Sequence, residues 1–216
     1  MAIESGPRIV TNGLIYDLDG AVSRSYSGSG LTVYDAETSA IGGTLVNGVT
    51  YSSNNNGYFV FDGTNDYINV GNDSSLQISS GTISAWARTS SPGGSFRGIV
   101  AKQFAYGIFY NDSVFVAYDW QASATRSSGI NIADGAWKNL VLTFSGGIGS
   151  LYLNGSSVLS TTYNINNNSY NLFIGAEANA GQYAACNIAQ VLVYNRAITA
   201  SEVLQNYNTT KKRYGL

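Results

Sequence analysis

The chain has 216 residues, 11% of them charged, with a formal net charge of −2, no histidine and one cysteine. Because the net charge is small and slightly negative, the protein has no positive field that would attract nucleic acid or an anionic membrane. Without histidine, Ser-His-Asp and Cys-His catalytic arrangements and histidine-bound zinc are excluded, and a single cysteine excludes an intrachain disulfide.

The N-terminal segment MAIESGPRIV has no charged start followed by an apolar run, so we expect no secretory signal. No apolar run approaches the ~18 residues of a membrane span, and we expect a soluble protein with no membrane partner. If the protein acts outside a cell, we expect release by another route, such as lysis or as part of a particle.

The composition favours short strands joined by tight polar turns, because Gly (25) and Tyr (16) are abundant and Pro (2) is scarce. In chain order, the predicted strands lie near residues 9–10, 13–18, 31–34, 44–46, 58–62, 66–70, 82–88, 98–102, 105–110, 114–119, 130–132, 138–145, 150–154, 157–161, 171–175 and 187–195. No composition shift marks a linker and no segment repeats at a fixed period, so we predict one domain over residues 1–216. Many short strands at close spacing predict a sandwich or a barrel.

The clearest local signal is WKNLVLTFSGGIGSLYLNG at 137–155. Two alternating strands flank a glycine-rich turn, and the second strand ends at Asn154-Gly155. This dipeptide suits the tightest hairpin turns, because both central positions accept positive φ. With a third strand at 156–161, the segment predicts an antiparallel meander.

Alternation assigns faces to the last predicted strand. One face carries Ala189, Val191 and Val193. The opposite face, which includes Leu192 and Tyr194, is too apolar for a bare surface. We therefore expect another layer, such as a C-terminal helix, to cover it.

A helix is predicted over 200–207, because a Thr-x-x-Glu capping box precedes apolar residues at helical spacing. We expect Val203, Leu204 and Tyr207 to face the sandwich. The basic run at 211–213 is interpreted as a solvated tail.

Glycoside hydrolysis stays open without histidine, because it needs only two carboxylates. The nearest pairs are Asp17 with Asp19 and Asp35 with Glu37, each spaced to share one face of a strand. Both pairs lie beside polar turn signals, where aspartates commonly cap backbone amides, so we favour turn capping over catalysis.

Several segments together resemble the laminin-G-like jelly rolls of the concanavalin-A-like lectin/glucanase superfamily. They are GLIYDLDG (13–20), GGTLVNGVTY (42–51), GYFVFDGTNDYINV (57–70), GTISAWAR (81–88), WKNLVLTF with LYLNG (137–155), and IGAEANAGQYAACNIAQVLVYNRAITASEVLQNYN (174–208). They follow the family's usual order and cover most of the chain. The FDGTNDYI block and the YNRAITASEVLQNYN ending are similar to variants common in tailed-phage genomes, often in virion or tail-associated proteins.

The resemblance implies an all-β fold of two antiparallel sheets in a jelly-roll sandwich with one concave face. It also implies binding of glycans or proteins. Hydrolytic relatives carry a Glu-x-Asp-x-x-Glu or Glu-x-Asp-x-Glu run, which this chain lacks, so we expect no enzyme. Family members often have His where this chain has Lys138, and an acidic residue where it has Ala189-Gln190, so ligand roles tied to those positions are not carried over.

Some members of the family hold a calcium ion at the sandwich rim. Here Asp62, Asn65 and Asp66 form an oxygen-rich turn, whereas Ca²⁺ takes about six to eight oxygens. A tight turn with side-chain capping explains the same residues. We therefore expect no cofactor, and Asp62 and Asp66 are the calcium candidates if one binds.

Aromatic planes can stack on sugar rings. Trp120 follows a predicted strand beside a small polar loop and is the leading ligand candidate, with Tyr118 and Tyr183 in support. Trp86 lies on the polar face of its strand, where it either packs or lines the concave sheet. Trp137 is assigned to packing, as are most rings in a tyrosine-rich protein.

The leading hypothesis is a non-catalytic phage virion surface protein, a decoration or adhesion module that binds surface glycans or neighbouring virion proteins. Many copies engaging together would strengthen weak sites. The alternative is a purely structural, self-assembling or partner-binding virion component without sugar binding, which would use its sheet edges and the Leu192/Tyr194 face as contacts. A glucanase with an unrecognised carboxylate pair is the remote alternative.

Overall fold

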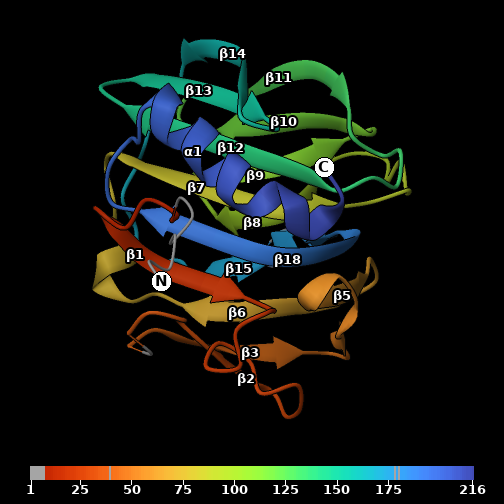
Figure 1. Cartoon of the computed structure of the whole chain (residues 1–216). Coiled ribbons are helices and arrows are strands. Elements are labelled where there is room, and N and C mark those ends of the chain that lie inside the picture. The colour runs from red at the N-terminus through yellow and green to blue at the C-terminus, as the bar shows by residue number, and fades with distance from the viewer. Residues whose placement is uncertain (1–7, 39, 178, 180) are drawn as a thin grey trace.

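The computed structural model describes residues 8–38, 40–177, 179 and 181–216 (Figure 1). Two antiparallel sheets pack face to face, and one C-terminal helix lies outside them. The predicted all-β jelly-roll sandwich with a short C-terminal helix is confirmed. The part of the N-terminal segment that bears most on the signal-peptide prediction, residues 1–7, lies outside the described residues.

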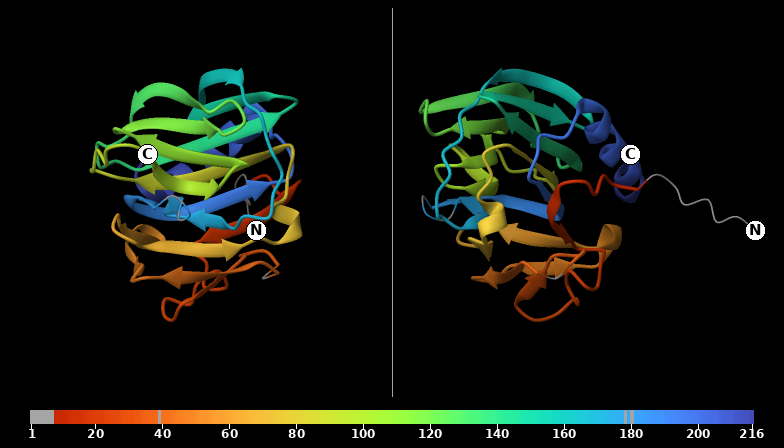
Figure 2. Two further views of the ribbon diagram at one scale, coloured as in Figure 1. Left: turned by 180° about the vertical axis from the view of Figure 1, so that it is seen from behind. Right: turned by 90° about the vertical axis from the view of Figure 1, so that its left-hand side faces the viewer.

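The first sheet carries the helix on its outer face and is called the helix-covered sheet. Its strands, in spatial order, are β14 (Ser156–Thr162), β13 (Ile148–Leu153), β12 (Lys138–Ser145), β7 (Gly81–Arg88), β18 (Ala185–Tyr194), β5 (Tyr58–Asp62) and β4 (Thr50–Ser52), with β1 (Leu14–Asp19) also paired to β18. The side view of Figure 2 shows that the helix lies against this sheet and not against the other.

No helix of the described residues lies on the outer face of the second sheet, which is called the uncovered sheet. Its strands, in spatial order, are β11 (Ala124–Asn131), β10 (Val114–Asp119), β9 (Tyr106–Asn111), β8 (Arg97–Lys102), β15 (Leu172–Ile174), β6 (Tyr67–Gly71), β3 (Gly42–Val46) and β2 (Thr32–Tyr34). A small hairpin of β16 (Ala176–Glu177) and β17 (Gln182–Tyr183) extends from β15.

The predicted meander is present as β12, β13 and β14. Leu140 pairs with Leu153 and Thr143 with Ser150, which keeps the apolar residues of both strands in phase. The turn into β14 has φ of 51° at Asn154 and 80° at Gly155, as the Asn-Gly dipeptide predicts for a turn with two positive φ angles.

One irregularity in β18 changes the predicted faces of that strand. The register against β7 shifts between Ile188 and Gln190, so Ile188 enters the main core. Val191 and Val193 also face that core, as predicted, but Ala189 packs on the outer side of the sheet. A bulge of this kind adds a residue to one strand and reverses the side-chain alternation beyond it.

The C-terminal helix α1 (Ala200–Thr210) is longer than predicted and continues as the 3₁₀ turn η4 (Lys211–Tyr214). It covers Leu192 and Tyr194, which are 3% and 0% exposed. The expected cover for this face is thus confirmed, and the proposed use of the same face as an external contact is wrong. Within the described ranges, no helix has the length and apolar character to cross a membrane.

The predicted apolar stripe of the helix is partly wrong. Val203 is buried, but Leu204 is 46% exposed. Asn206 is buried instead: its side chain donates to the Tyr194 hydroxyl at 2.9 Å and accepts from the Val10 amide at 2.8 Å. A buried amide that satisfies its hydrogen bonds can replace an apolar residue at such a contact.

Candidate functional site: an aromatic pocket on the uncovered sheet

Four aromatic side chains form a cluster on the outer face of the uncovered sheet, here called the aromatic patch: Phe96, Phe109, Tyr118 and Trp120. Their rings meet edge to face in a closed circuit. Centroid distances are 5.3 Å for Phe96–Tyr118, 5.9 Å for Phe96–Phe109, 5.9 Å for Phe109–Trp120 and 5.5 Å for Tyr118–Trp120. Such T-shaped pairs stabilise one another and fix ring orientations.

Strand alternation places the patch. In β9, Tyr106, Ile108 and Tyr110 point into the main core, so Phe109 points outward. In β10, which pairs with β9, Tyr118 also lies on the outer side. Phe109 is almost fully buried beneath the other three rings, which remain partly exposed.

Trp120 is held by a buried carboxylate at the end of β10. Asp119 accepts from the amides of Ala122 at 3.0 Å and Asn164 at 3.1 Å, and it pairs with Arg126 at 2.9 Å. Burial raises the pKa of Asp119, but Arg126 and these hydrogen bonds outweigh burial and lower it overall. The charged form is thus favoured, and it fixes the turn on which Trp120 sits.

A pocket of about 350 Å³ lies elsewhere on the molecule, but the patch has its own pocket of about 250 Å³. The polar residues Gln103, Glu177 and Gln182 line it together with the rings. Gln103 donates to the Glu177 carboxylate at 3.4 Å. An aromatic floor with a few polar groups at one side is the usual composition of a small-ligand site.

Two of the sequence-predicted ligand residues, Tyr118 and Trp120, come together in the patch. Tyr183 lies on the neighbouring hairpin, next to Gln182, and its ring is 6.2 Å from that of Tyr67. Tyr67 in turn meets Phe173 at 5.4 Å. A second aromatic group therefore adjoins the patch across the β16–β17 hairpin.

Trp86 lies on the other sheet and takes no part in this pocket. It is 1% exposed and stacks on Tyr214 with a centroid distance of 4.1 Å. Its indole nitrogen donates to the Thr210 hydroxyl at 2.8 Å. In this structure, Trp86 is a docking point for the C-terminal segment and is not accessible to a ligand. Trp137 also packs against Tyr214, as its assignment to packing predicts.

The turn between β5 and β6 contains Asp62 and Asp66. Asp62 accepts from the Thr64 amide at 2.7 Å, and this bond holds the pKa of its carboxyl below the usual range. Asp66 is buried, which raises its pKa, and it accepts from the Asp62 amide at 3.2 Å. The capping interpretation of Asp62 is confirmed.

The carboxylates of Asp62 and Asp66 already accept backbone hydrogen bonds, so they supply few of the oxygens that Ca²⁺ needs. Across the part of the chain that the structure describes, no group of three or more acidic, cysteine or histidine side chains is arranged to hold a metal ion. The expectation of no cofactor stays a prediction, tested below.

Three of the four carboxylates considered for hydrolysis, those of Asp17, Asp19 and Asp35, accept hydrogen bonds that hold the fold. Asp17 and Asp19 are 4% and 7% exposed, and the Gln190 amide donates to both. Asp19 also caps the Ala21 amide at 2.8 Å, as a turn predicts. Asp35 accepts from the amides of Asp17 and Thr38, again as predicted for a capping residue.

Sequence reasoning missed the other members of the pocket. The signal for Phe109 was available, since it is the large apolar residue on the outward side of an otherwise well-alternating strand. Phe96 lies just before β8 in a Ser/Pro/Gly-rich loop, where no periodicity applies. Gln103 lies in the turn between β8 and β9, whereas Glu177 and Gln182 pair with each other across the β16–β17 hairpin, and only the fold brings this hairpin to the rings.

A family model described as "Concanavalin A-like lectin/glucanases superfamily" matches residues 62–204. No curated protein matches the chain. Among solved structures, it is similar to the binding domain of Paraclostridial Mosquitocidal Protein 1, with 18% identity, a TM-score of 0.72, and coverage of 91% of this chain and 52% of that one.

Two further solved structures are similar. One is Trypanosoma rangeli sialidase in complex with sialic acid, with 15% identity, a TM-score of 0.76, and coverage of 96% of this chain and 35% of that one. The other is the receptor binding domain of botulinum neurotoxin C/D mosaic serotype, with 13% identity, a TM-score of 0.69, and coverage of 91% and 51%. At such identities the likeness shows the fold alone, and the chain spans 52% or less of each of these three solved chains.

Proposed function

Because the chain belongs to the concanavalin A-like lectin/glucanase superfamily, we propose that it is a non-catalytic binding module whose aromatic patch recognises glycans. The observation that carries this proposal is the pocket itself, which three partly exposed rings and three polar residues line on the uncovered sheet.

The chemistry suits a sugar ring. The C–H face of a pyranose is apolar and packs on an aromatic plane, while its hydroxyls take hydrogen bonds from the edge. Trp120 and Tyr118 offer the planes, and Gln103 and Gln182 offer both donors and acceptors. The rings are already fixed by their mutual contacts, so little side-chain entropy is lost when a ligand binds.

Absence of catalysis is part of the proposal. Glu177 is the one carboxylate among the described residues that line this pocket, whereas glycoside hydrolysis generally uses two. Two of the solved structures of similar fold are a binding domain of a mosquitocidal protein and a receptor binding domain of a botulinum neurotoxin. That likeness supports a binding role without identifying a ligand.

We further propose that the module acts on the surface of a phage virion, in many copies, as a decoration or adhesion protein. This rests on the FDGTNDYI block and the YNRAITASEVLQNYN ending of the sequence. Pocket affinities of single sugars are weak, and multivalency would raise them by orders of magnitude. Antibody labelling of particles from a host that encodes the chain tests this placement, and unlabelled particles would refute it.

The glycan proposal is tested with a multivalent form of the protein on a glycan array. We expect binding that Trp120→Ala and Tyr118→Ala each reduce at least tenfold, whereas Tyr34→Ala, an exposed tyrosine at the edge of the same sheet, leaves it unchanged. An array that stays silent, or binding that survives loss of both rings, would sink the proposal.

A further inference from the structure

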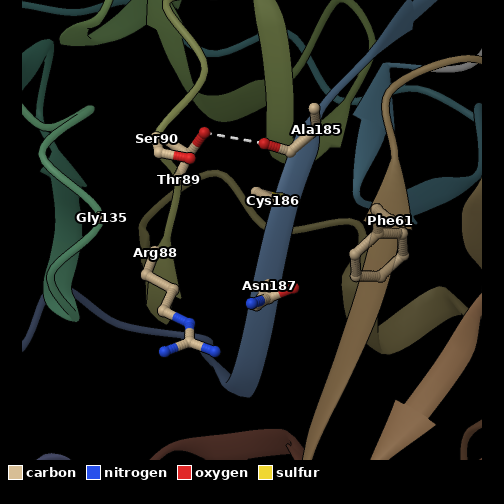
Figure 3. Close-up of a pocket in the computed structure, with 8 residues that line it drawn as sticks. All are labelled: Phe61, Arg88, Thr89, Ser90, Gly135, Ala185, Cys186 and Asn187. Carbon is tan, nitrogen blue, oxygen red and sulfur yellow. Dashed lines mark hydrogen bonds between the residues drawn. The ribbon is translucent and has the colours of Figure 1, made fainter.

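A second pocket, here called the rim pocket, has a volume of about 350 Å³. It lies where β7 ends and β18 begins, as Figure 3 shows. Its lining consists of Phe61, Arg88, Thr89, Ser90, Gly135, Ala185, Cys186 and Asn187. Apart from Arg88, none of these side chains is charged. Burial raises the pKa of the Cys186 thiol to about 12, so it adds no negative charge.

Arg88 is held in place on several sides. Its guanidinium lies 5.0 Å from the ring centre of Tyr58 and 4.9 Å from that of Trp137. It donates to the Tyr58 hydroxyl at 3.2 Å. Asn187 is the register partner of Arg88 on β18, and its side-chain oxygen accepts from Nε at 2.9 Å and from Nη2 at 3.1 Å in the amide orientation that satisfies both groups.

Among the described residues, the guanidinium has no anionic partner. Four ion pairs occur among the described residues, and Arg88 belongs to none of them. Its hydrogen bonds to Tyr58 and Asn187 use Nε and Nη2, so the two donors of Nη1 can serve another partner. A partly buried cation that is fixed but unneutralised is a ready partner for a carboxylate, which arginine recognises through a planar fork.

The volume of the pocket indicates a ligand larger than a bare anion. Its volume falls in the usual range for small-molecule sites. Ser90 is exposed at the pocket, whereas the Phe61 side chain, which also borders it, is 3% exposed and packs in the main core. The Thr89 hydroxyl is already committed, because it donates to the Ala185 carbonyl at 2.7 Å (Figure 3).

We propose that the rim pocket binds a sugar ring that carries a carboxylate, with Arg88 binding the carboxylate and Ser90 contacting the ring. This site is separate from the aromatic patch and does not depend on the function proposed for it. The two lie close along the chain: Gln182 lines the aromatic pocket and Ala185 lines the rim pocket.

The experiment is a titration of the ¹⁵N-labelled protein with glucuronate, galacturonate and N-acetylneuraminate, followed by NMR. Glucose and acetate serve as matched probes that lack the carboxylate or the ring. We expect at least one acidic sugar to shift the Arg88 Nε resonance and the amides of 88–90 and 185–187 with millimolar affinity. We expect glucose and acetate to bind at least tenfold more weakly.

Two variants separate the site from the fold. Asn187→Asp places a carboxylate beside the Arg88 guanidinium, so we expect a stable protein that binds acidic sugars at least tenfold more weakly. Arg88→Lys keeps the positive charge but loses the planar, two-point geometry of the guanidinium. We expect it to weaken binding of acidic sugars at least tenfold as well. Trp120→Ala, which alters the aromatic patch, should leave this binding unchanged.

The proposal is overturned if no acidic sugar shifts these resonances, if glucose or acetate binds as well, or if Asn187→Asp binds normally. Failure of glycan-array binding together with intact uronate binding would reject the function proposed for the aromatic patch and leave the rim pocket standing.

Discussion

Arg213 and Asp19 form a two-point ion pair between residues 194 positions apart, with Nη1–Oδ2 at 2.8 Å and Nη2–Oδ1 at 2.7 Å. Their side chains are 13% and 10% exposed. The pair joins β1 to the 3₁₀ turn η4 and thus holds the C-terminal segment over the helix-covered sheet. The interpretation of 211–213 as a solvated tail is therefore wrong for Arg213. A parallel fork between guanidinium and carboxylate is the strongest form of such a contact.

Replacing Arg213 should destabilise the protein strongly, because Asp19 would remain buried without its counter-charge. Removing one partner of a buried pair typically costs about 3–5 kcal/mol. We expect Arg213→Ala to lower the free energy of unfolding by about 3 kcal/mol in urea titration, and the exposed neighbour Lys212→Ala to change it little. Equal effects of the two variants would contradict this role for Arg213.

Asp17 should make the protein less stable as pH rises through neutrality. Burial, and next the charge of Asp19, raise the pKa of Asp17 to about 8, whereas an unfolded aspartate titrates near 4. The folded state therefore retains a proton that the unfolded state releases, so stability falls between pH 4 and 8. Asp17→Asn should match the parent at pH 4 and melt at a higher temperature at pH 8.

Glu202 provides a control, because its ionisation should change stability with pH in the opposite direction. The Arg196 guanidinium and the Thr199 amide lower the pKa of Glu202 to about 2. The ionised Glu202 carboxylate stabilises the folded state at pH values above its unfolded pKa, which is near 4.5. This stabilisation is lost as pH falls toward 2. Glu202→Gln should therefore be less stable than the parent at pH 7, with the gap closing in acid. Parallel pH profiles for the two variants would refute both assignments.

The start of the C-terminal helix depends on its capping box. Thr199 accepts from the Glu202 amide at 3.3 Å, and the Glu202 carboxylate accepts from the Thr199 amide at 2.8 Å. Loss of such a cap costs about 1 kcal/mol. We expect this decrease for Thr199→Ala in thermal unfolding, with less change for Ser201→Ala in the exposed first turn.

The two tryptophans on opposite sheets should respond in opposite ways. Trp86→Ala removes a fully buried ring and should cost about 3–5 kcal/mol, while the aromatic pocket stays chemically intact. Trp120→Ala should cost only about 1 kcal/mol, from its edge-to-face contacts, and should weaken glycan binding. Urea titration and array binding on both variants separate these outcomes. A large stability loss for Trp120→Ala would mean that this ring is structural.

Removal of calcium should have no effect on stability. Asp62 already accepts backbone hydrogen bonds in its turn, and Asp66 supplies the only other carboxylate there. We expect EDTA and millimolar Ca²⁺ to give the same melting temperature. A rise with Ca²⁺ that Asp66→Asn abolishes would instead establish a site at this turn.

The features that sequence could predict are those with local causes. The Asn154-Gly155 turn, the capping box and the core side of β18 near Val191 each follow from backbone preference or alternation. The strand β11 was predicted only over 130–132, because Ala124–Asn131 is mostly polar and shows no apolar alternation. Its partner β10 supplies the pairing that its own residues do not signal.

Of the residues that line the aromatic pocket, the sequence identified only Tyr118 and Trp120, at the end of one strand. Trp120 and Tyr118 lie two residues apart in one strand and its turn, so local sequence suffices to link them. Phe96 and Gln182 are brought to them by separate crossovers between strands, which no spacing in the sequence encodes. Arg88 is similar, since its surroundings depend on Asn187, Tyr58 and Trp137 from three other parts of the fold.

The ion-paired C-terminal segment determines how the protein is oriented when it is immobilised through a C-terminal tag. Because Tyr214 packs on Trp86, a tag or oligomerising peptide joined after Leu216 would emerge on the helix side of the sandwich. Protein coupled to beads or surfaces through that tag would present the aromatic patch to the solvent. Coupling through lysines at random would lose this common orientation.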